Sequence, residues 1–404
     1  MIKSQSTSCA SGRGGSPKLR RNWTRRAFLK LITTSAGVLA PVVRLHSRAK
    51  SLWPGARYSS ADRDHAIERG LEFIERIASK PEHFSRFGHD LIFCFYTISN
   101  TAKNAKLRAL AHDLVMRYAR QWRHDNPDPP GADSDALFLF AEGAAVADRT
   151  LGLDAALKQR VRLAAEPFSV VDFLRFDPGH EPPPKDIPEA CSKCNFQNPR
   201  GATICQKCQT PLTFHSPYDI WLDSLIMTHE SDSYGIKLGA SYPEALQWIS
   251  RMRPYPPPGN DEQAFDDVAY TVTHIVYTLN DYHTYRLSPA WLPQEFRYLK
   301  RNIRVAERYQ DWELVGEFMD ALRAFGVDES APEIRDGMSY LLSHQNSDGS
   351  WGNMDDDDIY TRYHSTWTAI DGLREYSFHG EGLRSPDLLA IITGRRAIAA
   401  TSNR

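Results

Sequence analysis

The chain has 404 residues, of which 41% are hydrophobic and 25% charged, so it has the composition of a globular protein and enough length for one large core or two domains. Its net charge of −1 hides an asymmetry, because residues 1–60 hold twelve Lys and Arg side chains and no acid, whereas the remainder holds 37 basic and 50 acidic side chains, a net charge of −13. Since phosphate contacts need a basic surface, this acidic remainder argues against nucleic acid as a partner.

The basic N-terminal region carries a pattern typical of export signals. Residues 24–30 have the sequence TRRAFLK, and a mildly apolar run of thirteen residues follows at 31–43. The pattern looks like a twin-arginine signal, and thirteen residues are too few for a comfortable transmembrane helix. We therefore expect a protein that meets the twin-arginine export machinery and becomes periplasmic or extracellular, with no stable transmembrane segment in the mature chain. An anchor formed by the uncleaved signal and a basic tail without a signal function are the alternatives.

From residue 61 onward the chain alternates between two kinds of predicted helix. Segments with one apolar stripe are followed by segments that are apolar on nearly every side, and no strand pattern competes with them. The striped segments lie at 61–80, 107–122, 155–166, 242–252, 293–307 and 331–344. The apolar segments begin near Asp90, Asp135, Asp219, Asp266 and Asp311, and a last one begins near Tyr363.

The spacing of these aspartates indicates a repeated unit. They follow one another at intervals of 45, 84, 47 and 45 residues, and the long interval exceeds its neighbour by about the length of segment 181–217. A helix that is apolar all round belongs in the interior, and a helix with a single stripe belongs outside it. We therefore predict an all-α fold, an (α/α)6 toroid of inner and outer helices built from 61–180 and 218–380. The aspartates are expected to be N-caps of the inner helices.

The segment 181–217 contains four of the six cysteines. They form two CxxC pairs with ten residues between the pairs, at Cys191, Cys194, Cys205 and Cys208. Each CxxC turn directs two thiolates at one point, so two such turns complete a tetrahedral Zn²⁺ site. We predict an inserted zinc ribbon with a structural Zn²⁺, because four thiolates leave no open position. Two disulfides are the alternative for an exported protein.

Residues 345–352 have the sequence QNSDGSWG, in which turn-forming residues break a helix before a tryptophan. This stretch resembles the QW motif of the squalene–hopene cyclase and protein prenyltransferase superfamily. In that superfamily the motif closes an outer helix onto the next inner helix of an α/α toroid. The active site lies at the mouth where the N-terminal ends of the inner helices meet. The resemblance therefore implies a site at the same mouth here.

Two segments at that mouth resemble functional motifs of the superfamily. The sequence YHST at 363–366 looks like the prenyltransferase segment whose histidine binds catalytic zinc, and Glu313 stands where its partner motif Asp-x-Cys has the cysteine. The resemblance implies Asp311, Glu313 and His364 as ligands of a second divalent metal, with a helix cap and a mouth-facing histidine as the alternative. The sequence FDDVA at 265–269 resembles part of the cyclase acid motif. It implies Asp266 and Asp267 as candidate catalytic acids beside His364, with capping as the alternative.

These expectations combine into one leading function and two alternatives. The leading one is an exported lyase, isomerase or transferase that resembles terpenoid cyclases and prenyltransferases and acts on an apolar or isoprenoid-like small molecule, with or without a metal at the mouth. One alternative is a non-catalytic scaffold that binds an envelope protein or a polymer through the mouth and the ribbon. The other is a carbohydrate-active (α/α)6 enzyme that uses Asp266 and Asp311. Residues 1–60 are expected to be signal and linker, and residues 381–404 a C-terminal tail.

Aromatic side chains of the predicted inner helices bear on the choice of substrate. They could line an apolar cavity and stabilise carbocations through their π faces, or they could pack the inner ring and leave no room for a ligand. The residues concerned are Phe93, Phe138, Trp221, Tyr270, Tyr277 and Trp367.

Overall fold

The computed structural model describes residues 58–131, 133–355 and 358–394, so the predicted export signal lies outside the described residues. Within these ranges the protein is helical, with four isolated β-bridges and no strand, which confirms the prediction of an all-α fold. No helix in the same ranges combines the length and the apolar character that crossing a membrane requires.

The two predicted kinds of helix alternate along the chain. The amphipathic helices are α2 (Ser60–Ala78), α4 (Ala105–Asp125), α6 (Ala155–Ala165), α9 (Tyr242–Leu246) with α10 (Ile249–Met252), α12 (Pro293–Tyr309) and α14 (Pro332–Ser343). The more apolar helices are α3 (Pro81–Thr101), α5 (Ser134–Leu151), α8 (Pro217–Tyr234), α11 (Glu262–Leu279), α13 (Trp312–Ala324) and α15 (Ile359–Leu373). Two short helices, α7 (Val170–Leu174) and α16 (Leu388–Thr393), lie outside this alternation.

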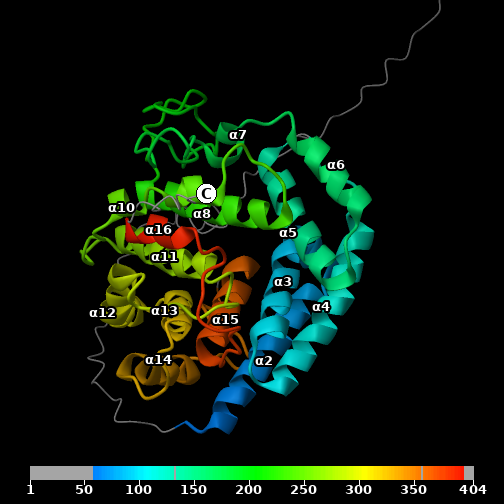
Figure 1. Ribbon diagram of the computed structural model, residues 1–404, viewed down its shortest axis with the longest axis vertical. Helices are drawn as coiled ribbons and strands as arrows, with labels where there is room; N and C mark the ends of the chain where they lie inside the picture. Colours follow the sequence, from blue (N-terminus) through cyan, green and yellow to red (C-terminus); the bar gives the residue numbers. More distant parts are fainter. Residues whose placement is uncertain (1–57, 132, 356–357, 395–404) are drawn as a thin grey trace, which may run out of the picture.

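The apolar helices contact one another in a fixed order. Helix α3 contacts α5, α5 contacts α8, and α8 contacts α11. Helix α11 contacts α13, α13 contacts α15, and α15 contacts α3 again. The amphipathic helices lie against neighbouring members of this series: α4 contacts α3 and α5, and α12 contacts α11 and α13. In Figure 1, α4 and α6 lie at the right-hand edge and α12 at the left, with α15 between them. Apolar side chains of both kinds of helix form one core.

The predicted helix caps require correction. Asp311 does cap α13, because its carboxylate accepts a hydrogen bond of 2.8 Å from the backbone N–H of Leu314. The other apolar helices begin earlier than the aspartates suggested, since their first turns are polar and carry no apolar periodicity. The actual N-cap residues of α5, α8 and α11 are Asp133, Ser216 and Asp261, and α3 begins at a proline without a side-chain cap.

The QNSDGSWG segment joins α14 and α15 to the first helix of the described chain. Trp351 is fully buried, and its indole N–H donates to the carbonyl of Leu341 in α14 (2.8 Å) while its backbone N–H donates to Thr366 Oγ1 in α15 (2.9 Å). The amide of Gln345 donates to the carbonyl of Ala66 in α2 (2.8 Å). Helices that are far apart in the sequence are thus fastened at one seam.

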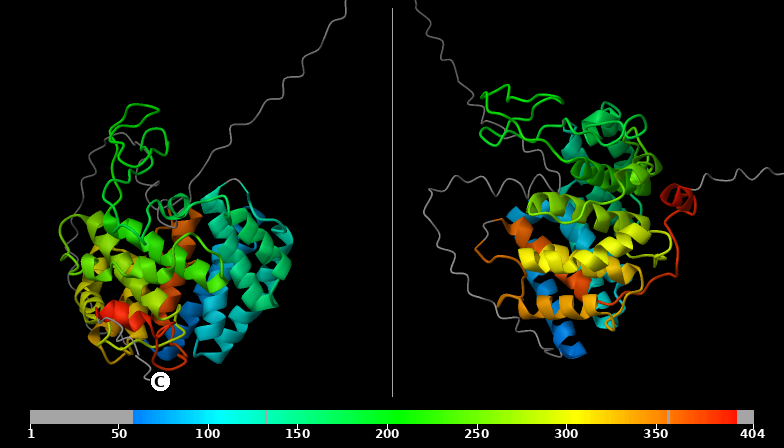
Figure 2. Two further views of the ribbon diagram at one scale, coloured as in Figure 1. Left: turned by 45° about the horizontal axis from the view of Figure 1, so that its top comes forward. Right: turned by 90° about the vertical axis from the view of Figure 1, so that its left-hand side faces the viewer.

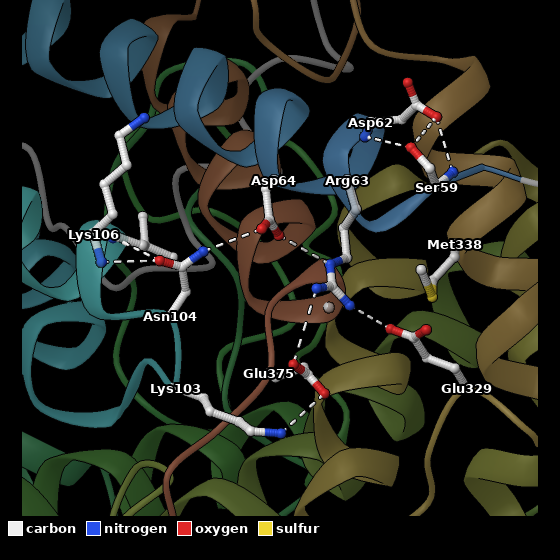
Figure 3. A network of polar contacts seen from close by, with 12 residues as sticks. Ser59, Asp62, Arg63, Asp64, Lys103, Asn104, Lys106, Glu329, Met338 and Glu375 are labelled. Atoms are coloured by element: carbon white, nitrogen blue, oxygen red, sulfur yellow. Dashed lines mark hydrogen bonds and ion pairs between the residues drawn. The ribbon is translucent and has the colours of Figure 1, made fainter.

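A second set of contacts at this seam is polar and partly exposed. Arg63 of α2 forms ion pairs with Glu329, in the connection between α13 and α14, and with Glu375, which follows α15 (Figure 3). Lys103 reaches the same Glu375 carboxylate at 3.4 Å. Because both glutamates are nearly half exposed, water screens these pairs, and each contributes at most about 1 kcal/mol.

Helices α13 and α15 cross at two glycines, where they approach each other more closely than any larger residue at these positions would allow. A Cβ atom placed on Gly316 would lie 2.4 Å from the carbonyl oxygen of Thr368, and one placed on Gly372 would lie 2.8 Å from the carbonyl oxygen of Gly316. Backbone therefore packs on backbone at this crossing. The contact fixes the distance between the two helices that carry Glu313 and His364.

Candidate functional sites: a cysteine cluster and a buried acid–histidine cluster

The cysteine-containing segment projects from the helices and consists of two similar turns (Figure 2). In the first turn the N–H of Asn195 donates to the carbonyl of Cys191 (2.7 Å), and in the second the N–H of Gln209 donates to the carbonyl of Cys205 (2.9 Å). Asn195 and Gln209 both have positive φ values, 54° and 60°, which bend the backbone around each CxxC pair. The local sequence therefore builds the same tight loop twice.

The two turns bring their four thiols together. The Sγ atoms of Cys191, Cys194, Cys205 and Cys208 all lie within 4.8 Å of one another, with 3.4 Å between Cys191 and Cys208. None of the cysteines in the described ranges forms a disulfide. A hydrogen bond with Thr210 lowers the pKa of the Cys208 thiol to about 6, whereas burial and hydrogen bonds with the other cysteines raise the pKa of Cys194 to about 12. The four cysteines are thus a group that could hold a metal ion.

If the cluster binds a metal ion, we expect removal of that ion to unfold the segment locally and to leave the helices folded. The segment has little core of its own, since Phe196, Ile204 and Phe214 are 37–52% exposed, so metal ligation would supply most of its stability. Chelation should therefore open the exposed bonds after Lys193 and Lys207 to limited trypsin digestion. Helical circular dichroism should stay nearly constant.

Metal content and digestion of variants check this expectation. Replacement of all four cysteines by serine should remove one metal ion per chain and give the chelated digestion pattern without a chelator. Cys94→Ser is the control, because this buried thiol lies alone in α3 and should keep the metal. Trypsin resistance in the metal-free protein would show that the segment folds without an ion.

A second cluster of ionisable groups lies where α13 and α15 meet. The Nδ1 atom of His364 lies 3.0 Å from Oε1 of Glu313, and the same oxygen accepts a hydrogen bond from the hydroxyl of Tyr270 in α11 (2.9 Å). Burial is the largest single influence on the pKa of His364 and lowers it, but the charge and hydrogen bond of Glu313, together with the charges of Asp90 and Glu317, raise that pKa to about 9. Burial raises the pKa of Glu313, and the pairing with His364 brings it below its ordinary value. The two side chains form a buried ion pair.

Two further carboxyl groups adjoin this pair and favour the protonated form. Burial and the neighbouring charge of Glu313 raise the pKa of Glu317 to about 8 and that of Asp311 to about 7. Glu317 is buried and accepts a hydrogen bond from Thr273 Oγ1 (2.5 Å). The Nδ1–H of His274 donates to the carbonyl of Tyr270 (2.8 Å). One ionised and two protonatable carboxyl groups therefore share the site, which is an arrangement suited to proton transfer.

The structure brings some of the predicted site residues together and separates others. Glu313 and His364 are in contact, as the resemblance implied. Asp311 caps α13. Among the described residues, it does not belong to any group of three side chains whose ligand atoms all lie within 4.8 Å of one another. The metal site predicted at Asp311, Glu313 and His364 therefore stays a prediction. Asp266 and Asp267 lie in the second turn of α11 instead of at its start, and Asp267 accepts a hydrogen bond from Gln263 (2.7 Å).

Sequence reasoning missed Glu317 and Asp320, although the chain contains a signal for them. Glu313, Glu317 and Asp320 follow one another at helical spacing inside an otherwise apolar segment, so they share one face of α13. All three are at most 4% exposed. Burial of an acidic side chain costs folding free energy unless a hydrogen bond or an ion pair compensates it. Acidic residues on the buried face of an apolar helix are therefore unusual, and this pattern could have identified Glu317 and Asp320.

The aromatic side chains that were expected either to line a cavity or to pack the interior are buried, and two of them, Phe93 and Trp367, contact each other. The ring of Phe93 lies 5.9 Å from that of Trp367 and 5.0 Å from that of Tyr282, and all six predicted residues are at most 8% exposed. A surface hollow of about 500 Å³ is lined by α4 and α5, including Arg120 and Arg123, and no residue of the Glu313 cluster borders it.

Comparison with known proteins gives no family assignment, because no family model, curated protein or solved structure matches this chain.

Proposed function

We propose that this chain is an (α/α)6-toroid enzyme that performs acid–base chemistry on an apolar or isoprenoid-like substrate at the Glu313–His364 pair. The toroid is supported by the cyclic order of contacts among the apolar helices, and its relation to terpenoid cyclases and prenyltransferases by the placement of Trp351 at the seam. Export by the twin-arginine pathway remains part of the proposal. We further propose Zn²⁺ in the cysteine cluster, because four thiolates in this arrangement suit zinc in a closed structural site.

The observation that carries the catalytic proposal is the concentration of ionisable side chains around Glu313. An ion pair and two protonatable carboxyl groups in an apolar interior lower stability relative to apolar residues, and such groups gather at functional sites. The Nδ1 atom of His364 faces Glu313, which holds the imidazole in one orientation and leaves Nε2 for a substrate or a metal. The His364 side chain is 12% exposed, so the site reaches the surface.

Turnover by the His364→Ala variant tests this proposal. The probes are farnesyl diphosphate and squalene, with products followed by mass spectrometry. We expect the wild-type protein to convert at least one probe and the variant to lose at least about 100-fold in rate, the usual contribution of a positioned acid or base. The thermal transition should shift little. His344→Ala is the matched control, since the ring of this half-buried histidine packs at a tilt against that of Tyr340 in α14 (4.4 Å between centroids) and lies outside the cluster.

Two results would contradict the proposal. Conversion by His364→Ala at the wild-type rate would place the chemistry elsewhere, and a large loss of stability in this variant would make His364 a packing residue. Absence of turnover by the wild type would favour the second candidate, a scaffold that binds an envelope protein or polymer. A specific observation supports that candidate: Phe196, Ile204 and Phe214 place exposed apolar surface on the projecting cysteine segment.

A further inference from the structure

A third polar cluster lies deeper along the same helices. Asp320 follows Glu313 by seven residues in α13, and Asp371 follows His364 by seven residues in α15, so each lies about 10 Å further along its helix. His283, which follows α11, completes the group. One ligand atom from each of the three residues lies within 4.8 Å of the other two. The proposed function uses none of these residues.

Two of the facing atoms have no hydrogen-bond partner. His283 Nδ1 and Asp320 Oδ1 are 3.3 Å apart without the geometry of a hydrogen bond, and both residues are at most 3% exposed. Buried polar atoms in native proteins are nearly always satisfied, and an unsatisfied one needs an explanation such as a bound ion. Asp281, Tyr282 and His283 have positive φ values of 54°, 45° and 74°, a disfavoured run that places His283 against α13.

The two buried acids of the cluster differ in their cationic partners. Asp320 and Asp371 are 2% and 5% exposed, and the cation in direct contact with either of them is Arg374, which donates to Asp371 Oδ1 at 2.6 Å. Arg323 is also buried nearby, but its guanidinium donates to the carbonyl of Gly372 and pairs with Glu329. Tyr376, whose ring lies 4.7 Å from that of His283, is neutral. Among the described residues, Asp320 therefore forms no ion pair with a lysine or an arginine, and His283 is its ion-pairing neighbour.

We infer that His283, Asp320 and Asp371 form a divalent transition-metal site. One imidazole nitrogen and two carboxylate oxygens are a donor set that suits Zn²⁺, Mn²⁺ or Fe²⁺. Two ligands at about 2.1 Å from such an ion lie about 3.0–3.4 Å apart, and His283 Nδ1 and Asp320 Oδ1 have this spacing. Asp320 and Asp371 lie in the C-terminal parts of α13 and α15, where the helix dipoles also favour a cation, and His283 lies in the segment that follows α11. Because the ligands are buried, the ion is structural and ties three helices together.

Titration of the metal-free full-length protein with Co²⁺ tests this site and separates it from the cysteine cluster. Co²⁺ bound by thiolates has a sulfur-to-metal charge-transfer band, which a nitrogen and oxygen site lacks. We expect the wild type to bind two ions, of which one produces this band. Asp320→Asn and His283→Gln should each lose the ion without the band and keep the other. Asp148→Asn is the control, because this buried carboxylate of α5 pairs with Arg123 of α4 and its replacement should leave both ions bound.

Several outcomes would overturn the inference. Binding of a single ion with the thiolate band in the wild type would show that a proton, instead of a metal, balances Asp320. Retention of both ions by Asp320→Asn and His283→Gln would exclude these residues as ligands. Loss of the second ion in His364→Ala but not in His283→Gln would assign that ion to the Glu313 cluster. Because the wild-type titration alone is informative, the test holds even where a variant fails to fold.

Discussion

Replacement of Trp351 by alanine is expected to lower the free energy of unfolding by about 3–5 kcal/mol. The indole is fully buried between α14, α15 and α2, and its N–H donates to the carbonyl of Leu341, so the substitution opens a cavity and removes one of the two hydrogen bonds that this carbonyl accepts. Repacking cannot fill the space, because Gly70 faces the indole and has no side chain to extend into it. Urea denaturation followed by circular dichroism measures the effect.

Trp351→Phe is the matched control for the hydrogen bond. It keeps most of the apolar volume and removes the N–H, so we expect a loss of about 1–2 kcal/mol from the lost hydrogen bond and a small cavity, while the Leu341 carbonyl keeps its bond from the N–H of His344. A loss of less than about 1 kcal/mol in the alanine variant would mean that Trp351 does not fasten the seam. Equal losses in the two variants would assign the effect to the hydrogen bond alone.

Replacement of Gly316 by alanine is expected to cost about 3 kcal/mol or more, at the upper end of overpacking effects. The new Cβ would lie 2.4 Å from the carbonyl oxygen of Thr368 and 2.5 Å from its carbon. These are backbone atoms inside α15, so no side-chain rotation relieves the contact and the two helices must separate. The midpoint and slope of urea denaturation measure the loss.

Gly259→Ala provides the comparison, because the nearest atom to its added Cβ is 4.0 Å away, and we expect a change within about 0.5 kcal/mol. The Gly316 variant has a further consequence. Separation of α13 from α15 lengthens the distance between Glu313 and His364, so any activity at this pair should fall with stability. Unchanged stability would contradict the close approach of the two helices.

The all-helical fold could be predicted from the sequence because apolar residues recur at helical spacing over long segments. The caps could not be located, since the first turns of helices such as α11 are polar and only backbone geometry shows that Asp261, five residues before Asp266, begins the helix. Glu313 and His364 could be paired only through the resemblance to prenyltransferases. Helical periodicity predicts which side of a helix is buried, but it does not predict which side chains of two different helices contact each other.

The cluster of His283, Asp320 and Asp371 shows a different limit. Asp320 is visible as an acid in an apolar helix, but His283 follows a helix end and reaches Asp320 only because three successive residues have positive φ. Glycine is the residue that most readily adopts positive φ, and none of Asp281, Tyr282 and His283 is a glycine, so their residue types do not predict this conformation. The cysteine cluster is the opposite case, because the spacing of its two CxxC pairs was enough to predict that four thiols meet.

The seam at Trp351 also sets the order in which the chain can finish folding during synthesis. Gln345 binds the carbonyl of Ala66, which lies 279 residues earlier, and Arg69 binds the carbonyl of Asn346. At about 5–20 residues per second, a ribosome needs roughly 15–55 seconds to make the chain between them. During this time the side of α2 that packs on α15 stays uncovered in the nascent chain. Protection of that apolar surface from aggregation is therefore a requirement of biosynthesis, and a chaperone that binds α2 would meet it.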